Sequence, residues 1–227
     1  MQGYNSQELP TPSPWDAAPW GESQRSSFPV PVLERPSRTI LSPPPEEWFA
    51  WLFALKGAPM PLFNRHAAAR YATRYALASN PAYPEFPNDC TSFVSQSLLE
   101  GGWTMTEGSV WNRTDDNVWW WGKSSFTRAS YTWGGAHNFS RYVTLSGRGR
   151  SCPREDLDYG DVVQIARNNH VFHTMIVTSL TASAAGNGPH MSYHTTHTLN
   201  KFLGTIEASY PSSSGYSFLY WKILDVF

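Results

Sequence analysis

Several features that would place a chain in a simple class are scarce or missing in this 227-residue sequence. Cysteine occurs only twice, as Cys90 and Cys152, which is too few for a disulfide framework, although one disulfide between the two is left open. No Cys-x-x-Cys spacing indicates a zinc site. Charged residues make up 15% of the chain and the formal net charge is −1, so no basic field would attract nucleic acid. We therefore expect no metal, no cofactor and no nucleic-acid partner.

Long apolar runs are also missing. No stretch approaches the roughly 18 to 20 residues that a membrane-spanning helix needs. The first residues, from Met1 to Tyr4, lack both the positive region and the apolar region of a signal peptide. The sequence predicts a protein without a membrane span that is cytoplasmic when made. If it is exported, it must use a secretion route that reads no cleavable signal.

Aromatic residues, by contrast, are abundant, with 11 Trp, 11 Tyr and 12 Phe. Such a content suits a dense core, or a groove that grips extended chains or sugars. Hydrophobic residues make up 41% of the chain, and its length suffices for one sizeable domain.

The composition divides the chain into two parts. Residues 1–45 are rich in Pro and Ser, as in Pro10–Pro14 and Pro43–Pro45, and are expected to form an extended arm or linker. Apolar anchors such as Trp15 and Trp20 leave open a docking or inhibitory role for this arm. Residues 46–227 are expected to form the folded domain.

Helices are expected first in that domain. The apolar run after Glu46 and Glu47 predicts a helix that ends near Gly57. Helices are also predicted over residues 64–76, 90–100 and about 136–146, with a Trp-rich, loop-like region at 103–135.

Strands are predicted to follow the helices. We expect them at 162–165, 173–180, about 190–197 and 216–224. This order predicts an α+β fold in which helices pack on a small antiparallel sheet.

Cys90 has the strongest local context for chemistry. Polar residues and prolines lead directly into it, and it opens the helix predicted at 90–100. A thiol at a helix N-terminus has a lowered pKa, and the N–H groups of the first turn point to where an oxyanion would develop. Cys90 is therefore the predicted nucleophile, with Asp89 or Asn88 positioning the loop before it.

A base must come from elsewhere in the chain, and His173 is the best of seven histidines. It begins an apolar strand after a polar loop, which we expect to place the imidazole at a sheet edge facing the helix. His194 lies on the next predicted strand, within about one register step, and could orient His173. His197 and Asn200 compete for that orienting role.

These residues stand in motifs that resemble the putative amidase domain family of bacteria, which is related to papain-like and NlpC-type cysteine peptidases. The resemblance covers about residues 62–224. The matching stretches are DCTSFVSQ at 89–96, GGW at 101–103, YTWGGA at 131–136, GDVVQ at 160–164, HTMIVT at 173–178 and YHT at 193–195, with NRHAAA at 64–69 and NPAY at 80–83. After the last motif, Thr196 and His197 replace the Asn or Asp usual in the family.

The resemblance implies a papain-like fold with Cys90 as nucleophile, His173 as base and His194 as third residue, with Asn200 in reserve. It implies hydrolysis of an amide bond through a thioester, with bacterial cell-wall peptides (peptidoglycan) as the first expected substrate. Trp103 and Trp133 are candidates for the walls of a substrate groove. An exported antibacterial effector paired with an immunity or inhibitor protein would also fit.

Two other readings use the same residues. One is a deamidase or acyl-transferring toxin that modifies a protein or lipid through the same thioester. The other is a catalytically inactive module that binds through an aromatic groove and has no reactive thiol.

Overall fold

The computed structural model describes residues 62–106, 108–124, 127–184 and 186–225. The arm expected at 1–45 and the helix expected to end near Gly57 lie outside the described residues. Within the described part of the chain, no helix is both long enough and apolar enough to cross a bilayer.

Helices come before most of the strands. The helices are α2 (Arg65–Tyr75), α3 (Cys90–Glu100), α4 (Tyr131–Gly134), α5 (Ala136–Ser146) and α6 (Leu203–Ser209), with 3-10 turns at Val110–Asn112, Arg154–Asp156 and Ser212–Ser214. The strands are β1 (Trp121–Ser124), β2 (Thr127–Ala129), β3 (Gly149–Ser151), β4 (Val162–Arg167), β5 (His170–Ser179), β6 (His190–Tyr193), β7 (Thr198–Phe202) and β8 (Tyr216–Ile223).

Helices α2, α3 and α5 lie where the sequence predicted them, whereas α6 lies where no helix was predicted. The side chain of Asn64 caps α2 by accepting a hydrogen bond of 2.9 Å from the backbone N–H of Ala67. Helix α3 begins at Cys90 and ends against Gly101, as the sequence indicated. The region expected to be a loop holds more structure than predicted, since the hairpin of β1 and β2 and the short helix α4 lie within it.

Six strands form one sheet in the order β3-β8-β4-β5-β6-β7, and every neighbouring pair is antiparallel. This confirms the α+β class. The predicted place of His173 is wrong in one respect. Strand β5 begins at His170 and lies between β4 and β6, so His173 sits inside an interior strand and not at a sheet edge.

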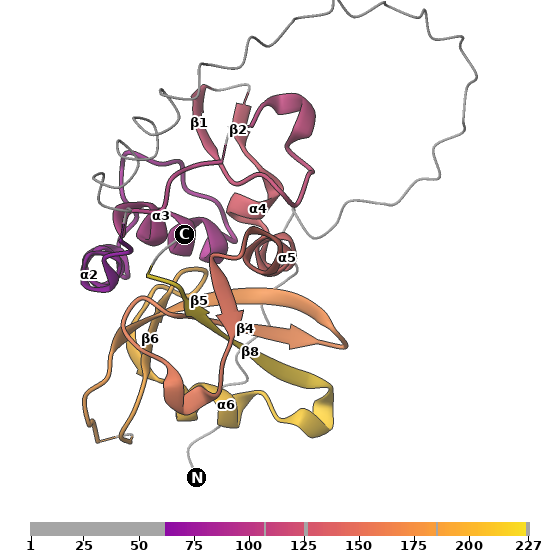
Figure 1. Cartoon of the computed structure of the whole chain (residues 1–227). Helices are drawn as coiled ribbons and strands as arrows, with labels where there is room; N and C mark the ends of the chain where they lie inside the picture. Colours follow the sequence, from indigo (N-terminus) through magenta and orange to yellow (C-terminus); the bar gives the residue numbers. More distant parts are fainter. Residues whose placement is uncertain (1–61, 107, 125–126, 185, 226–227) are drawn as a thin grey trace, which may run out of the picture. The chain divides into compact units, whose positions relative to one another are not determined.

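The two faces of the sheet bury separate hydrophobic clusters, because side chains alternate along a strand. Val162 and Ile176 pack with Phe93 of α3 in the first cluster. Their neighbours Val163 and Met175 pack in the second cluster, which includes Leu203 of α6. Accordingly, Figure 1 shows α2, α3 and α5 on one side of the sheet and α6 on the other.

Most of the tryptophans of the region at 103–135 serve this core. Trp103, Trp119 and Trp133 are at most 1% exposed and pack against one another or against neighbouring aromatic rings. Trp103 and Trp133 therefore cannot form the walls of an open groove, which corrects the expectation from the sequence.

Candidate active site: a cysteine at the start of a buried helix

Cys90 is the first residue of α3 and is 5% exposed. Its Sγ lies 3.8 Å from Oγ1 of Thr91. The N–H groups at the start of a helix have no acceptor inside the helix, and they concentrate positive potential there. A thiolate or an oxyanion at this position is stabilised by both effects.

Helix α3 is unusual because its buried residues are largely polar and are fixed by hydrogen bonds. Ser95 donates to the carbonyl oxygen of Trp133 at 2.8 Å, and the indole N–H of Trp133 donates to Ser92 at 3.2 Å. The hydroxyl of Tyr71 on α2 donates to Gln96 at 2.7 Å. These bonds fix how α3 is rotated about its axis and how it is placed along that axis relative to α2 and α4. They thereby fix the position of Cys90.

The start of α3 is attached directly to strand β5. The hydroxyls of Thr91 and Thr174 lie 2.9 Å apart, and the side-chain amide of Gln164 donates to Thr174 at 3.0 Å. Thr91 follows Cys90 and Thr174 follows His173. Neighbouring Cα atoms are about 3.8 Å apart. The Cα atoms of Cys90 and His173 therefore each lie about that far from the Cα atom of a threonine in this hydrogen bond.

His173 itself is buried and neutral at pH 7. Desolvation by burial lowers the pKa of its imidazole to about 4. Its backbone pairs with Ile165, and its ring meets the ring of Tyr193 edge-on, with centroids 4.9 Å apart. Strand alternation therefore directs the imidazole to the face opposite Thr174, towards the side on which Tyr193 packs.

His194 occupies the α3 side of the sheet. Continuing the register that pairs Ile176 with Ser192 places His194 opposite Thr174, just after β6 ends. Its Nδ1 lies 2.7 Å from a carboxylate oxygen of Asp89, and its Nε2 lies 2.7 Å from the carbonyl oxygen of Tyr75.

This arrangement changes the role predicted for His194. Both of its ring nitrogens face oxygen acceptors, so neither can accept a hydrogen bond from His173. The contact predicted between His194 and His173 is therefore replaced by contacts of His194 with Asp89 and Tyr75. The ring stacks instead on Phe93 of α3, at a centroid distance of 4.1 Å, and lies 4.7 Å from the ring of the exposed His197.

Asn200, the reserve candidate, belongs to a different cluster. Its Oδ1 accepts from the hydroxyl of Thr178 at 2.7 Å, and its backbone N–H donates to Ser192 at 3.1 Å. The contacts made by Asn200 thus fix β7 against β5 and β6, and they do not include His173 or His194.

Sequence reasoning missed four contributors to this site. Tyr75 supplies a backbone carbonyl, which no side-chain pattern reveals. Tyr71 looked like one more apolar residue on a helix face. Thr91 and Thr174 carried a usable signal, because each directly follows a predicted catalytic residue.

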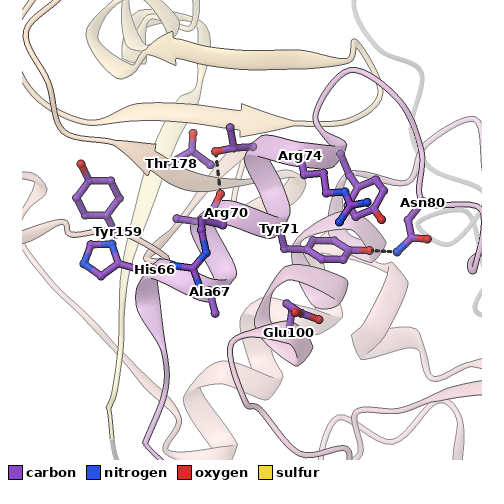
Figure 2. A pocket seen from close by; sticks show the side chains of 12 residues that line it. His66, Ala67, Arg70, Tyr71, Arg74, Asn80, Glu100, Tyr159 and Thr178 are labelled. Atoms are coloured by element: carbon purple, nitrogen blue, oxygen red, sulfur yellow. Dashed lines mark hydrogen bonds between the residues drawn. The ribbon is translucent and has the colours of Figure 1, made fainter.

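A cavity of about 810 Å³ lies beside α2. It is lined by His66, Ala67, Ala69, Arg70, Tyr71, Thr73, Arg74, Tyr75, Asn80, Glu100, Tyr159 and Thr178. Figure 2 shows the hydroxyl of Tyr71 turned towards Asn80, which donates to it at 2.8 Å. Tyr71 and Tyr75 connect this cavity to α3 and to His194, respectively.

Within the described residues, no group of three or more His, Cys, Asp or Glu side chains is arranged to hold a metal ion. Cys152 lies between β3 and the turn at Arg154–Asp156 and packs in the second hydrophobic cluster, whereas α3 packs in the first. Desolvation by burial, together with the nearby Asp161, raises the pKa of its thiol. A raised pKa makes a thiol less reactive, so Cys152 can serve as a control for Cys90.

Comparison with known proteins gives a match over most of the domain. Residues 63–219 match the family described as "Putative amidase domain". The chain is 31% identical over 173 residues to the uncharacterized protein YhbB of Bacillus subtilis (strain 168), covering 72% of this chain and 51% of that protein. It is 29% identical over 152 residues to the uncharacterized protein YjcM of the same bacterium, covering 61% of this chain and 32% of that protein. The chain thus spans about half or less of these relatives, and no solved structure matches it.

Proposed function

The chain belongs to the putative amidase domain family, and from this premise we propose that it hydrolyses amide bonds through Cys90, with His173 as the general base. The family description supports a hydrolase of amide bonds. The cysteine mechanism, the substrate and the residue roles are our proposal.

The observation that carries the proposal is the position of Cys90. It is the first residue of a helix whose polar side chains are buried and fixed, and the next residue is hydrogen-bonded to Thr174 of β5. A helix start of this kind favours a thiolate and offers N–H donors to an oxyanion. A purely structural cysteine needs none of these features.

The reaction proceeds in two steps. His173 takes the thiol proton, and the thiolate of Cys90 attacks the amide carbonyl carbon to form a tetrahedral oxyanion. As the C–N bond breaks, the imidazolium gives its proton to the leaving amine, which leaves a thioester on Cys90. Water then loses a proton to His173 and attacks the thioester, releasing a carboxylic acid and restoring the thiol.

An imidazole with a pKa of about 4 is free of its proton at pH 7 but is a weak base towards a thiol, so the proposed step requires the forming thiolate to stabilise the imidazolium and raise the pKa of His173. The imidazole leaves β5 on the face opposite Thr174. In this proposal, proton transfer from Cys90 therefore requires the thiol and the imidazole to come within hydrogen-bond reach, directly or through one water. The expected donors to the oxyanion are the backbone N–H groups at the start of α3.

The fold supports a more specific kinship. A nucleophile at the start of a helix packed on an antiparallel sheet, with a histidine on the adjacent strand, is the arrangement expected of a papain-like, NlpC-type enzyme. We include this kinship in the proposal, together with a peptide of the bacterial cell wall as the substrate. No feature of the described residues supports an exported effector or an immunity partner.

The test compares three proteins: the parent chain, Cys90→Ala and the matched control Cys152→Ala. Each is incubated with a panel of cell-wall peptides and simple amides, and released amine is measured. Hydroxylamine is added in parallel to capture the acyl group of the thioester, and the product is identified by mass spectrometry. We expect activity in the parent and in Cys152→Ala, and none in Cys90→Ala. Turnover by Cys90→Ala would overturn the proposal.

A further inference from the structure

Asp89 occupies the N-cap position of α3 but does not cap it. An N-cap aspartate ordinarily accepts hydrogen bonds from the N–H groups two or three residues on. Here its backbone carbonyl accepts from the N–H of Phe93 at 2.8 Å, as in any helix, but its side chain makes no capping bond. The carboxylate is instead turned to His194, at 2.7 Å.

The contacts of His194 require it to carry two protons. A carboxylate and a backbone carbonyl are both acceptors, so Nδ1 and Nε2 must both donate, which makes the ring an imidazolium. Burial alone lowers the pKa of His194, but the hydrogen bond to Asp89, the charge of Asp89 and the bond to Tyr75 together raise it. Glu85 adds to this effect, and the ring of His197 lies 4.7 Å away.

We propose that His194 is a positioning residue that acts on Cys90 through Asp89. The imidazolium holds the Asp89 carboxylate away from the first turn of α3 and cancels its negative charge beside the nucleophile. This inference rests on the proposed function, because it concerns the same cysteine. It replaces the expected contact between His194 and His173 with a contact at the start of the helix.

Two physical effects follow if His194 is removed. A released carboxylate at the N-cap can take the N–H groups of Thr91 and Ser92, which would otherwise stabilise a thiolate or an oxyanion. An uncancelled negative charge one residue from Cys90 also disfavours the thiolate. Both effects raise the pKa of the Cys90 thiol, and both disappear if Asp89 is removed as well.

The experiment measures the alkylation rate of Cys90 against pH with a small thiol reagent, in full-length chains that all carry Cys152→Ala. Four proteins are compared: this parent, His194→Ala, Asp89→Ala, and the double variant. We expect His194→Ala to raise the thiol pKa by about one unit, which slows alkylation about tenfold below that pKa. Asp89→Ala should not raise it, and the double variant should return to within a few tenths of a unit of the parent.

A purely structural role for His194 predicts the opposite pattern, since losing both partners should then be at least as harmful as losing one. An unchanged pKa in His194→Ala, or a double variant no better than His194→Ala, would overturn the inference. His197→Ala is the matched control, because it removes an exposed histidine beside the same ring. If His194→Ala does not fold, His194→Gln replaces it in both the single and the double variant. Glutamine keeps a hydrogen-bond donor but loses the charge, so the expected rise in the pKa of the Cys90 thiol is smaller. Adding Asp89→Ala must still return that pKa towards the parent value.

The experiment also separates this inference from the proposed function. If the parent thiol has the ordinary pKa of about 8.5, the proposed function of Cys90 fails at once. If the parent pKa is low and does not depend on His194, only the inference about His194 fails.

Discussion

The hydroxyls of Thr91 and Thr174 share a hydrogen bond of 2.9 Å, and each threonine directly follows one of the two residues proposed to carry the chemistry. Both side chains are fully buried. The bond joins the first turn of α3 to an interior strand of the sheet, so it fixes where Cys90 lies relative to β5.

Replacing Thr174 with Val should therefore destabilise the fold and slow the reaction together. Valine keeps the shape but leaves the hydroxyl of Thr91 and the side-chain amide of Gln164 without this partner, and a buried polar group that loses its partner costs about 1 to 3 kcal/mol. We expect that loss in urea unfolding and a lower rate of amide hydrolysis in the folded variant. The control is Thr144→Val, which removes an exposed hydroxyl bonded within α5 and should change stability by no more than about 0.5 kcal/mol. Equal stabilities for the two variants would contradict the role assigned to this bond.

His173 should make the protein sensitive to acid. In the unfolded chain its imidazole titrates near the ordinary value of 6.5, whereas in the folded chain burial lowers its pKa to about 4. Between these values the unfolded state binds the proton and the folded state does not, so stability falls as pH falls. The full effect, reached near pH 4, is on the order of 3 kcal/mol.

The measurement is the free energy of unfolding of the parent chain and of His173→Gln at several values of pH from 8 to 4. Between pH 6.5 and 4 the free energy of unfolding of the parent should fall relative to that of His173→Gln, because only the parent must keep this imidazole unprotonated when folded. His197→Gln, at an exposed histidine, is taken through the same measurement as the control variant. Parallel curves for His173→Gln would show that this imidazole is not buried in its neutral form.

His194 should show the reverse dependence. Its pKa is raised in the folded chain, against the effect of burial, by its contacts with Asp89 and Tyr75. The folded state therefore holds its proton more tightly than the unfolded state does. The resulting stability is fully present below pH 6.5 and is lost as pH rises through the raised pKa. The free energy of unfolding of His194→Gln should thus lie furthest below that of the parent at acidic pH. The difference between the two should shrink as the pH is raised. A difference that grows as pH rises would contradict an imidazolium at this position.

Local signals sufficed to place α2, α3 and α5. Asn64 as a cap, Cys90 after a run of prolines and polar residues, and Gly101 as a stop are all features of short stretches of sequence. The start of α2 and both bounds of α3 follow from such features. They depend on backbone hydrogen bonds and side chains within a few residues, which a linear pattern records.

The arrangement of the site depended on long-range pairing, and there the sequence was less informative. The pattern of His173 and the apolar residues after it indicated a strand but not its neighbours, so it could not reveal that β5 is an interior strand. It also gave no register, and a shift of one residue exchanges the two faces of a strand. For that reason the sequence could not tell which of His173 and His194 faces α3. The contact of His194 with Asp89, 105 residues away, could not be read from local spacing.

Asp161 provides a final prediction, about what holds α2 against the sheet. Its carboxylate is fully buried, and Arg65 at the start of α2 and Lys222 of β8 lie 2.6 and 3.0 Å from it. It also accepts from the backbone N–H groups of Ile223 and Asp158. Removing one partner of a buried ion pair costs about 3 to 5 kcal/mol, because the other charge stays buried.

Asp161→Ala should therefore lower the free energy of unfolding by several kcal/mol, as measured by urea denaturation. The matched control is Asp116→Ala, since the partner of Asp116 in its ion pair, Arg141, is mostly exposed and such pairs contribute about 1 kcal/mol or less. Because the contacts of the Asp161 carboxylate are with Arg65, Lys222, Ile223 and Asp158 and not with α3, a variant that still folds at low temperature should retain an alkylation profile like that of the parent. A loss of stability no larger than in the control would show that α2 is held by its apolar face alone and that this ion pair adds little.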